Sequence, residues 1–267
     1  MFTQRVVYEL KRNISIIKVA IKNSYVYKMK LFFYSLMGIM QFLIYWFLWK
    51  AIISGGKTIN GFNQEHIMTY FVLSFIIQSM LPRWITMEIG WKNKRGDIAI
   101  DLLRPINFQR YLLFYSIGDV IYTMGFMGLP ILILGIFSKT LIYSDNFIYF
   151  FLSLINSYLI SFYMFYIVGL LSFWVTNIWG VFISFEVIYL FFSGALIPIT
   201  FLPDYLITIS SFLPFKSLVE TPIMIYLGLA DSTFISILIQ LVWLVVLKGI
   251  SVIMFNKARK RTEIFGG

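Results

Sequence analysis

The chain has no cysteine and a single histidine, His66, among its 267 residues. The lack of cysteine excludes a disulfide framework, a cysteine nucleophile and a Cys/His zinc cluster. His66 stands beside Glu65 with no second ligand at a useful spacing, so we expect no metal site there. Neither paired carboxylates nor a Ser/His/Asp set falls in one expected cavity. An enzyme is therefore the least favoured class, and we expect this chain to bind no cofactor of its own.

Charged residues are also scarce, at 13% of the chain, whereas 60% of the residues are hydrophobic and the mean hydropathy is +0.83. A soluble domain of this length needs far more surface charge, so the composition predicts an integral membrane protein. The net charge is +10. Because the basic residues gather at the ends of apolar segments, they indicate membrane topology and anionic lipid rather than a nucleic-acid partner.

Residues 1–28 carry charges throughout and lack an uninterrupted apolar core, so we do not expect a cleaved signal peptide. On a helix of about 100° per residue the segment has two faces. The apolar arc contains Phe2, Val6, Leu10, Ile14, Ile17, Ile21 and Tyr25, and the basic arc contains Arg5, Lys11, Arg12, Lys18 and Lys22. This pattern favours an amphipathic helix in the membrane interface. An amphipathic helix packed on protein is the alternative.

The remaining apolar segments predict an all-α membrane protein with six transmembrane helices in one domain, 1–267. The expected spans are residues 31–49, 67–89, 112–137, 147–173, 181–197 and 234–255. Pro82 and Arg83 should kink the second span. Segment 198–228 is apolar but is divided by Pro198, Pro203, Pro214 and Pro222. We therefore expect two short half-helices there, forming an extracellular re-entrant hairpin before the sixth span.

Basic residues fix the orientation of these spans. They are concentrated before the first span, in the loop 91–110 and in the tail after residue 256, whereas the other loops hold few. By the positive-inside rule both termini and the loop 91–110 are cytoplasmic. A crossing by 198–228 would place the basic tail outside the cell, which supports the hairpin and an even number of spans.

Residues 51–58, AIISGGKT, satisfy a relaxed phosphate-binding loop in which Gly56 and Lys57 would hold phosphates and Thr58 magnesium. That mechanism requires a preceding strand, whereas here a membrane helix precedes the loop. The predicted topology also places the loop outside the cell. We therefore interpret it as a glycine turn without nucleotide.

Two acidic residues lie within expected spans. Glu186 is in the middle of the fifth, where a carboxylate is costly and normally faces protein or water. Two readings stay open for it: a polar point on a substrate pathway or subunit seam, and a structural hydrogen bond to Tyr189, Ser184 or another helix. Asp119, nearer the cytoplasmic end of the third span, is interpreted as structural.

The charged loop 91–110, WKNKRGDIAIDLLRPINFQR, is the most specific signal in the chain. Gly96 and Asp97 favour a helix start, and Pro105 ends the helix. The apolar residues between them, Ile98, Ile100, Leu102 and Leu103, exceed what a cytoplasmic loop needs. Such a helix is suited to a groove on a partner protein. Contact with lipid alone is the alternative.

The run Gly96-Asp97-Ile98, followed by Asp101-Leu102-Leu103-Arg104-Pro105-Ile106-Asn107, resembles the cytoplasmic loop of type-2 ABC exporter permeases. This is the ABC-2 family, in the branch long filed as a domain of unknown function. The amphipathic start, six spans and proline-rich hairpin match the family layout. Asp97 stands where glutamate is more frequent, and Phe108 where a second proline is common.

The resemblance implies a permease that pairs with a second permease, identical or not, and with two P-loop ATPase subunits that bind ATP and magnesium. The loop helix would couple to the ATPase through Gly96, Asp97, Ile98, Ile100, Asp101, Leu102, Leu103, Arg104 and Pro105. Residues 1–28 would be the elbow helix, and the hairpin would close the extracellular exit of a bacterial plasma-membrane exporter.

Three functions remain in competition. The first is ATP-driven export of a hydrophobic or amphipathic compound, such as an antibiotic, a peptide or a lipid-like molecule. The second is export of a cell-envelope glycan by the same fold. The third is an ATP-independent lipid scramblase or a membrane anchor for a partner complex. Export as the direction of transport comes from the resemblance alone.

Overall fold

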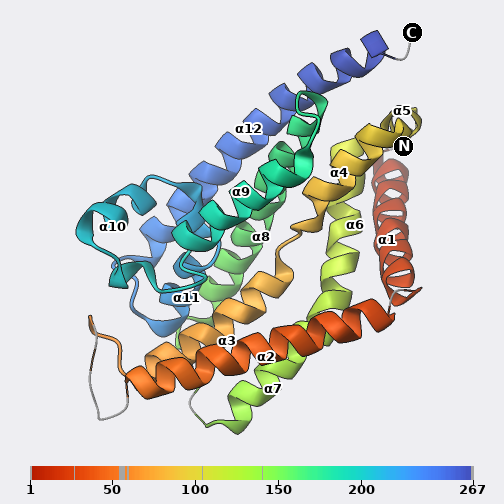
Figure 1. Ribbon diagram of the computed structural model, residues 1–267. Coiled ribbons are helices and arrows are strands. Elements are labelled where there is room, and N and C mark those ends of the chain that lie inside the picture. Colours follow the sequence, from red (N-terminus) through yellow and green to blue (C-terminus); the bar gives the residue numbers. More distant parts are fainter. Residues whose placement is uncertain are drawn as a thin grey trace.

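The computed structural model describes residues 2–26, 28–53, 58, 60–103, 105–139 and 141–265, and all regular structure in these ranges is helical. The α-helices are α1 Phe2–Val26, α2 Lys28–Ile52, α3 Gln64–Met80, α4 Trp84–Arg95, α5 Asp97–Leu102, α6 Phe108–Thr123, α7 Leu129–Phe137, α8 Phe147–Leu170, α9 Ile178–Phe192, α10 Asp204–Ser211, α11 Glu220–Leu227 and α12 Thr233–Phe265. Short turns are η1 Met124–Gly128, η2 Leu171–Phe173, η3 Ile199–Phe201 and η4 Pro214–Ser217. The two chain ends and α5 lie toward one end of the molecule, whereas α10 and α11 lie toward the other (Figure 1).

Four helical stretches are long and apolar enough to cross a membrane: Ser35–Ile52, Phe108–Phe137, Phe147–Phe173 and Thr233–Arg261. The second of these combines α6, the π-helical turn η1 and α7 into one continuous stretch. Two further predicted spans appear as shorter helices. The multi-pass membrane class is therefore supported, and the count of six crossings remains a prediction.

The expected kink at Pro82 is a full break between α3 and α4. Leu81 has an extended backbone, with φ −75° and ψ 126°, because the residue before a proline is disfavoured in the helical region. The helix restarts at Trp84, and Thr86 Oγ1 donates to Phe165 O of α8 at 2.8 Å. The break separates α3, which belongs to the second predicted span, from a 12-residue helix, α4, that leads to the predicted cytoplasmic loop.

The fifth predicted span, 181–197, differs from the observed helix α9, which starts three residues earlier and ends five residues earlier. It ends where Gly194 adopts φ +80°, a conformation that favours glycine. At about 1.5 Å per residue, its 15 residues reach only about 22 Å. Residues 193–203 continue the segment as irregular chain and the turn η3. Segment 198–228 contains two short helices, α10 and α11, which together we call the hairpin, and its re-entrant path in the membrane stays a prediction.

The core is built around α8, of which 56% is buried, against 17–22% of the other three candidate spans. Helices α4, α11 and α12 all pack on it. Gly169 permits the close approach of α4, since a Cβ there would lie 2.8 Å from Ile89 Cδ1. Gln240 Nε2 of α12 donates to Ser153 O at 3.3 Å and to Ser217 O at 2.9 Å. Together these contacts hold the hairpin and α12 against α8.

Helix α1 has a protein face and an uncovered face. Asn13, Ile16, Ala20 and Ser24 are buried, and α1 packs along α6. Of the predicted apolar arc, Leu10 is 55% exposed, Ile14 49% and Tyr25 60%. The helix therefore rests on protein with one face and leaves apolar side chains outward, and its place in the membrane interface stays a prediction. At the other end of the chain, α12 continues as helix through the basic tail to Phe265, beyond the predicted span.

Candidate functional site

The sharp reversal between α4 and α5 depends on Gly96. Gly96 has φ +80° and ψ 0°, and it ends α4 while it caps the start of α5. Its N–H donates to Asn93 O at 3.1 Å, which satisfies one of the last carbonyls of α4. Asp97 then occupies the first turn of α5, where a negative side chain is favoured. The predicted helix start at Gly96 and Asp97 thus coincides with the observed one.

Helix α5 and its C-cap residue Leu103 have an inner and an outer face. Ile98 is 2% exposed and belongs to the main core, and Asp101 is 6% exposed. Ile100 and Leu103 point outward, with 62% and 85% of their surfaces exposed. Arg104 and the side chain of Leu102 lie outside the described residues, and the chain leaves the helix before Pro105. Of the apolar side chains in the predicted coupling set, Ile100 and Leu103 are thus free for a partner, whereas Ile98 supports the fold.

A lysine that the sequence reasoning did not single out anchors α5 to α4. Lys92 Nζ lies 2.7 Å from Asp101 Oδ2 and 3.5 Å from Glu88 Oε1, and it faces the Tyr111 ring at 5.9 Å. Burial lowers the pKa of the Lys92 ammonium, but the hydrogen bond and charge of Asp101 outweigh burial, so the pKa is raised. The spacing of four residues between Glu88 and Lys92 on one helix predicts their contact from the sequence. The contact with Asp101 depends on the turn at Gly96.

A second pair, Arg95 and Asp97, lies at the outer surface of the same turn. Arg95 Nε is 2.7 Å from Asp97 Oδ2, and the two side chains are 61% and 44% exposed. Water screens this pair far more than the Lys92–Asp101 pair, so it contributes little to holding α5 in place.

A cavity of about 550 Å³ lies between α2, α3, α6 and α9. Aromatic side chains line it together with several polar ones. The polar side chains are Gln41, Gln78, Ser79, Arg83, Asp119, Thr123 and Glu186. Polar side chains in membrane segments usually face such a cavity or another helix.

Glu186 forms an ion pair across this cavity. Arg83 Nη1 lies 3.2 Å from Glu186 Oε2, and their side chains are 37% and 13% exposed. Glu186 Oε1 is buried and has no hydrogen-bond partner among the described residues. Glu186 is thus paired with Arg83, which follows the break at Pro82, and not with its neighbours Tyr189 or Ser184. The sequence alone could not reveal this pair, because 103 residues separate its members.

Asp119 lines the same cavity and also holds α1. Asp119 Oδ1 accepts a hydrogen bond from Ser24 Oγ at 2.9 Å. The structural role expected for Asp119 thus corresponds to an observed contact between α6 and the end of α1.

At the opposite end of the molecule, Glu220 is a buried acidic residue that the sequence alone did not single out. Glu220 is fully buried at the start of α11, and its Oε2 accepts from the Ile199 N–H at 2.6 Å. Its own N–H donates to Ser193 O at 3.0 Å, while Tyr70 OH donates to Gly194 O at 2.7 Å. These bonds tie the end of α9 to the hairpin and to α3.

The structure describes only part of the two motifs that we interpret as non-functional, residues 51–58 and His66. Residues 54–57, which include Gly56 and Lys57, lie outside the described residues. His66 completes a capping box with Asn63, the N-cap of α3: the His66 N–H donates to Asn63 Oδ1 at 2.8 Å, and His66 Nδ1 accepts from the Asn63 N–H at 3.4 Å. Across the part of the chain that the structure describes, no three His, Cys, Asp or Glu side chains gather as metal ligands would.

A comparison with protein families matches residues 30–266 to the ABC-2 family transporter proteins. A comparison with curated proteins gives no significant match. The family match covers nearly the whole helical bundle, including α5, the intramembrane cavity and the hairpin. Permeases of this family are membrane subunits of ABC transporters and normally work with separate ATPase subunits. With its apolar helices and this match, the chain belongs to the ABC-2 transporter family, as a membrane permease component.

Proposed function

We propose that this protein is the permease subunit of an ABC exporter that moves an amphipathic or hydrophobic compound out of a bacterial cell. It would work with a second permease and with two ATPase subunits that bind ATP and magnesium. Both termini and α5 would be cytoplasmic, because the basic residues gather at that end of the molecule. The hairpin of α10 and α11 would then close the extracellular side.

The observation that carries the proposal is the outward face of α5. Ile100 and Leu103 are 62% and 85% exposed at the end of the molecule that holds the basic chain termini. Two large apolar side chains exposed to water are unfavourable unless a partner covers them. A short helix with two apolar anchors suits a groove on an ATPase surface.

Helix α4 is suited to transmit movement of α5 into the membrane. At one end it is joined to α5 through Gly96 and the Lys92–Asp101 pair. At the other end, about 18 Å away for 12 residues, Arg83 contacts Glu186 of α9. A rigid shift of α4 driven by the ATPases would therefore displace one partner of the ion pair in the cavity. Such a shift is a mechanism for alternating between inward-facing and outward-facing states.

The cavity supports an amphipathic substrate. It offers both signs of charge, amide and hydroxyl groups, and the aromatic rings of Phe75, Trp84 and Phe182. Its volume of about 550 Å³ lies within the range of small-molecule sites, which favours a compound of that size over a long glycan. A second permease covering the gap between α2 and α9 would enclose the pathway.

Co-purification of an ATPase with the Leu103→Asp variant tests this function. A charge at this exposed position should leave the permease folded and lower ATPase recovery at least tenfold, a loss of ~1.4 kcal/mol or more. Tyr143→Asp is the matched control, since Tyr143 is 96% exposed near the opposite end of the helices. Unchanged ATPase recovery with Leu103→Asp, or lipid transport by the purified chain without any ATPase, would contradict the proposal. Ile98→Asp is unsuitable here because Ile98 is buried.

A further inference from the structure

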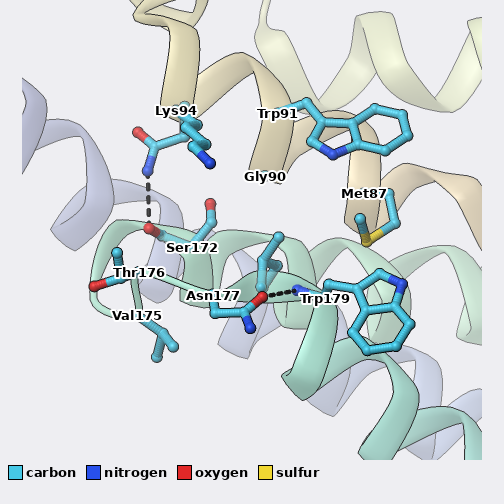
Figure 2. Close-up of a pocket in the computed structure, with 11 residues that line it drawn as sticks. Met87, Gly90, Trp91, Lys94, Ser172, Val175, Thr176, Asn177 and Trp179 are labelled. Carbon is cyan, nitrogen blue, oxygen red and sulfur yellow. Dashed lines mark hydrogen bonds between the residues drawn. The ribbon is translucent and has the colours of Figure 1, made fainter.

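A separate pocket of about 320 Å³ lies beside the cytoplasmic loop, between the end of α4 and the turn that joins α8 to α9 (Figure 2). Its walls are fixed by contacts within the protein. Asn93 Nδ2 donates to Ser172 O at 2.8 Å, and Asn177 Oδ1 accepts from the Trp179 N–H at 3.2 Å. Gly90 lets α4 lie directly against Ile178, since a Cβ there would overlap Ile178 Cγ2. The fold therefore holds the pocket in a defined shape.

The charge in this pocket has one sign. Among its lining residues, all of which the structure describes, Lys94 is the single charged side chain. The nearest carboxylates along α4 and α5 are committed elsewhere, Glu88 to Lys92 and Asp97 to Arg95. Ser172 Oγ is buried without a hydrogen-bond partner among the described residues and points into the space between α4 and the turn. A ligand with an anionic group and hydrogen-bonding oxygens matches these groups.

The mouth of the pocket has a different chemistry from its interior. Trp91 of α4 is 52% exposed and Trp179 of α9 is 59% exposed, and both indoles extend to the same side with Met87 between them (Figure 2). Exposed indoles are unfavourable in water but stable at the headgroup level of a membrane, where apolar and polar surroundings meet. An apolar side next to a cationic pocket indicates an amphipathic ligand.

We propose that this pocket binds the phosphate headgroup of an anionic phospholipid of the cytoplasmic leaflet, with Lys94 as the countercharge and Trp91 and Trp179 along the lipid chains. The inference rests on the orientation given under the proposed function. The occupied pocket would fix the cytoplasmic end of α4 next to α9. Lipid binding would therefore steady the helix that carries α5.

The test is photolabelling of the full chain in nanodiscs by phosphatidylglycerol or phosphatidylcholine carrying the same photoactivatable acyl chain. Phosphatidylglycerol should label the segments 87–94 and 172–179 several times more than phosphatidylcholine does. Lys94→Gln should lower this labelling about fivefold, equivalent to ~1 kcal/mol for one lysine near an anionic surface. Lys260→Gln, which removes an exposed charge from the tail, should leave it unchanged. Thr176→Lys, which adds a cation at the exposed rim, should raise it.

Equal labelling by the two lipids, or no effect of Lys94→Gln, would overturn the proposal. Suppression of the labelling by excess inorganic phosphate would indicate a soluble anion instead of a lipid. A loss of ATPase co-purification in Lys94→Gln with unchanged lipid labelling would assign the pocket to the ATPase. The nanodisc presents lipid to both faces and contains no ATPase, so this experiment can fail or succeed independently of the proposed transport function.

Discussion

Three ion pairs join α4 or its N-cap residue Arg83 to other elements, and they differ in how much water reaches them. The Arg95–Asp97 pair is 61% and 44% exposed, the Arg83–Glu186 pair 37% and 13%, and the Lys92–Asp101 pair 16% and 6%. Since exposed pairs contribute ~0–1 kcal/mol, whereas loss of one member of a buried pair leaves an unpaired charge, the Lys92–Asp101 pair should dominate. Its position makes it the anchor of α5.

Replacing Asp101 should therefore cost more than replacing Asp97 four residues earlier. We expect Asp101→Ala to lower the free energy of unfolding by ~1–3 kcal/mol and Asp97→Ala by less than ~1 kcal/mol. Thermal unfolding of the purified variants in detergent measures both. Because the pKa of Lys92 is raised, its contribution is complete below its ordinary value of 10.5 and is lost only as the pH rises through the higher folded value. The difference between the variants should thus stay constant from about pH 6 to 9, and equal losses would show that burial does not distinguish the pairs.

At the scale of helices, the contact between α1 and α6 depends on a glycine, Gly118, which has no side chain. A Cβ on Gly118 would lie 2.5 Å from Ile17 O and 2.7 Å from Ala20 Cβ, both of which are short and rigid parts of α1. Small residues at such contacts let helices in membranes approach closely. Gly118 therefore permits the close approach of α1 to α6.

Gly118→Ala should push α1 away from α6. We expect a destabilisation of ~1–3 kcal/mol and faster proteolysis within residues 2–26, measured by thermal unfolding and limited proteolysis. Gly249→Ala is the matched control, because a Cβ at Gly249 in α12 would meet no atom within 4 Å. It should be neutral or slightly stabilising, since alanine favours helix by up to ~1 kcal/mol over glycine. Similar effects of the two substitutions would show that the α1–α6 contact is loose.

The sequence predicts helices well where hydropathy and proline act locally, and less well where helix ends depend on other causes. The break at Pro82 and the divided segment 198–228 follow from proline chemistry. Helix α9 ends early because the Gly194 region turns back onto Tyr70 and Glu220, and hydropathy does not detect that contact. Helix α12 runs on into the basic tail because lysine and arginine are good helix formers, although they end an apolar span.

The same distinction applies to the candidate site. The loop helix could be predicted, because its glycine, apolar run and proline are adjacent in sequence. Which of its residues face outward could not be predicted, since the burial of Ile98 in the main core depends on how α5 packs in the folded protein. Arg83 as the partner of Glu186 and Lys92 as the partner of Asp101 likewise depend on the tertiary fold.

At the scale of the whole molecule, the two ends have different chemistry. One end carries α5, the pocket at Lys94 and the basic end of α12, and the other carries the hairpin with its buried Glu220. Between them, α2, α7 and α12 expose many large apolar side chains, which is favourable in lipid. This division is compatible with the coupling role proposed for one end and the closing role proposed for the other.

The absence of cysteine makes that arrangement directly testable, because each introduced thiol is unique. We expect a membrane-impermeant maleimide to label Tyr143→Cys and Asp204→Cys variants in intact cells, and Ala99→Cys, Thr176→Cys and Lys260→Cys variants only after permeabilisation. All five positions are exposed, so each should react once the membrane is opened, and the cysteine-free parent provides the blank. The labelling of Asp204→Cys and Lys260→Cys decides the number of crossings. A hairpin returns to the side from which it came, so α12 must then cross the membrane inward and place Lys260 in the cytoplasm. Labelling of Lys260→Cys in intact cells would mean that segment 198–228 crosses the membrane, and the coupling and closing ends would then have to be reassigned.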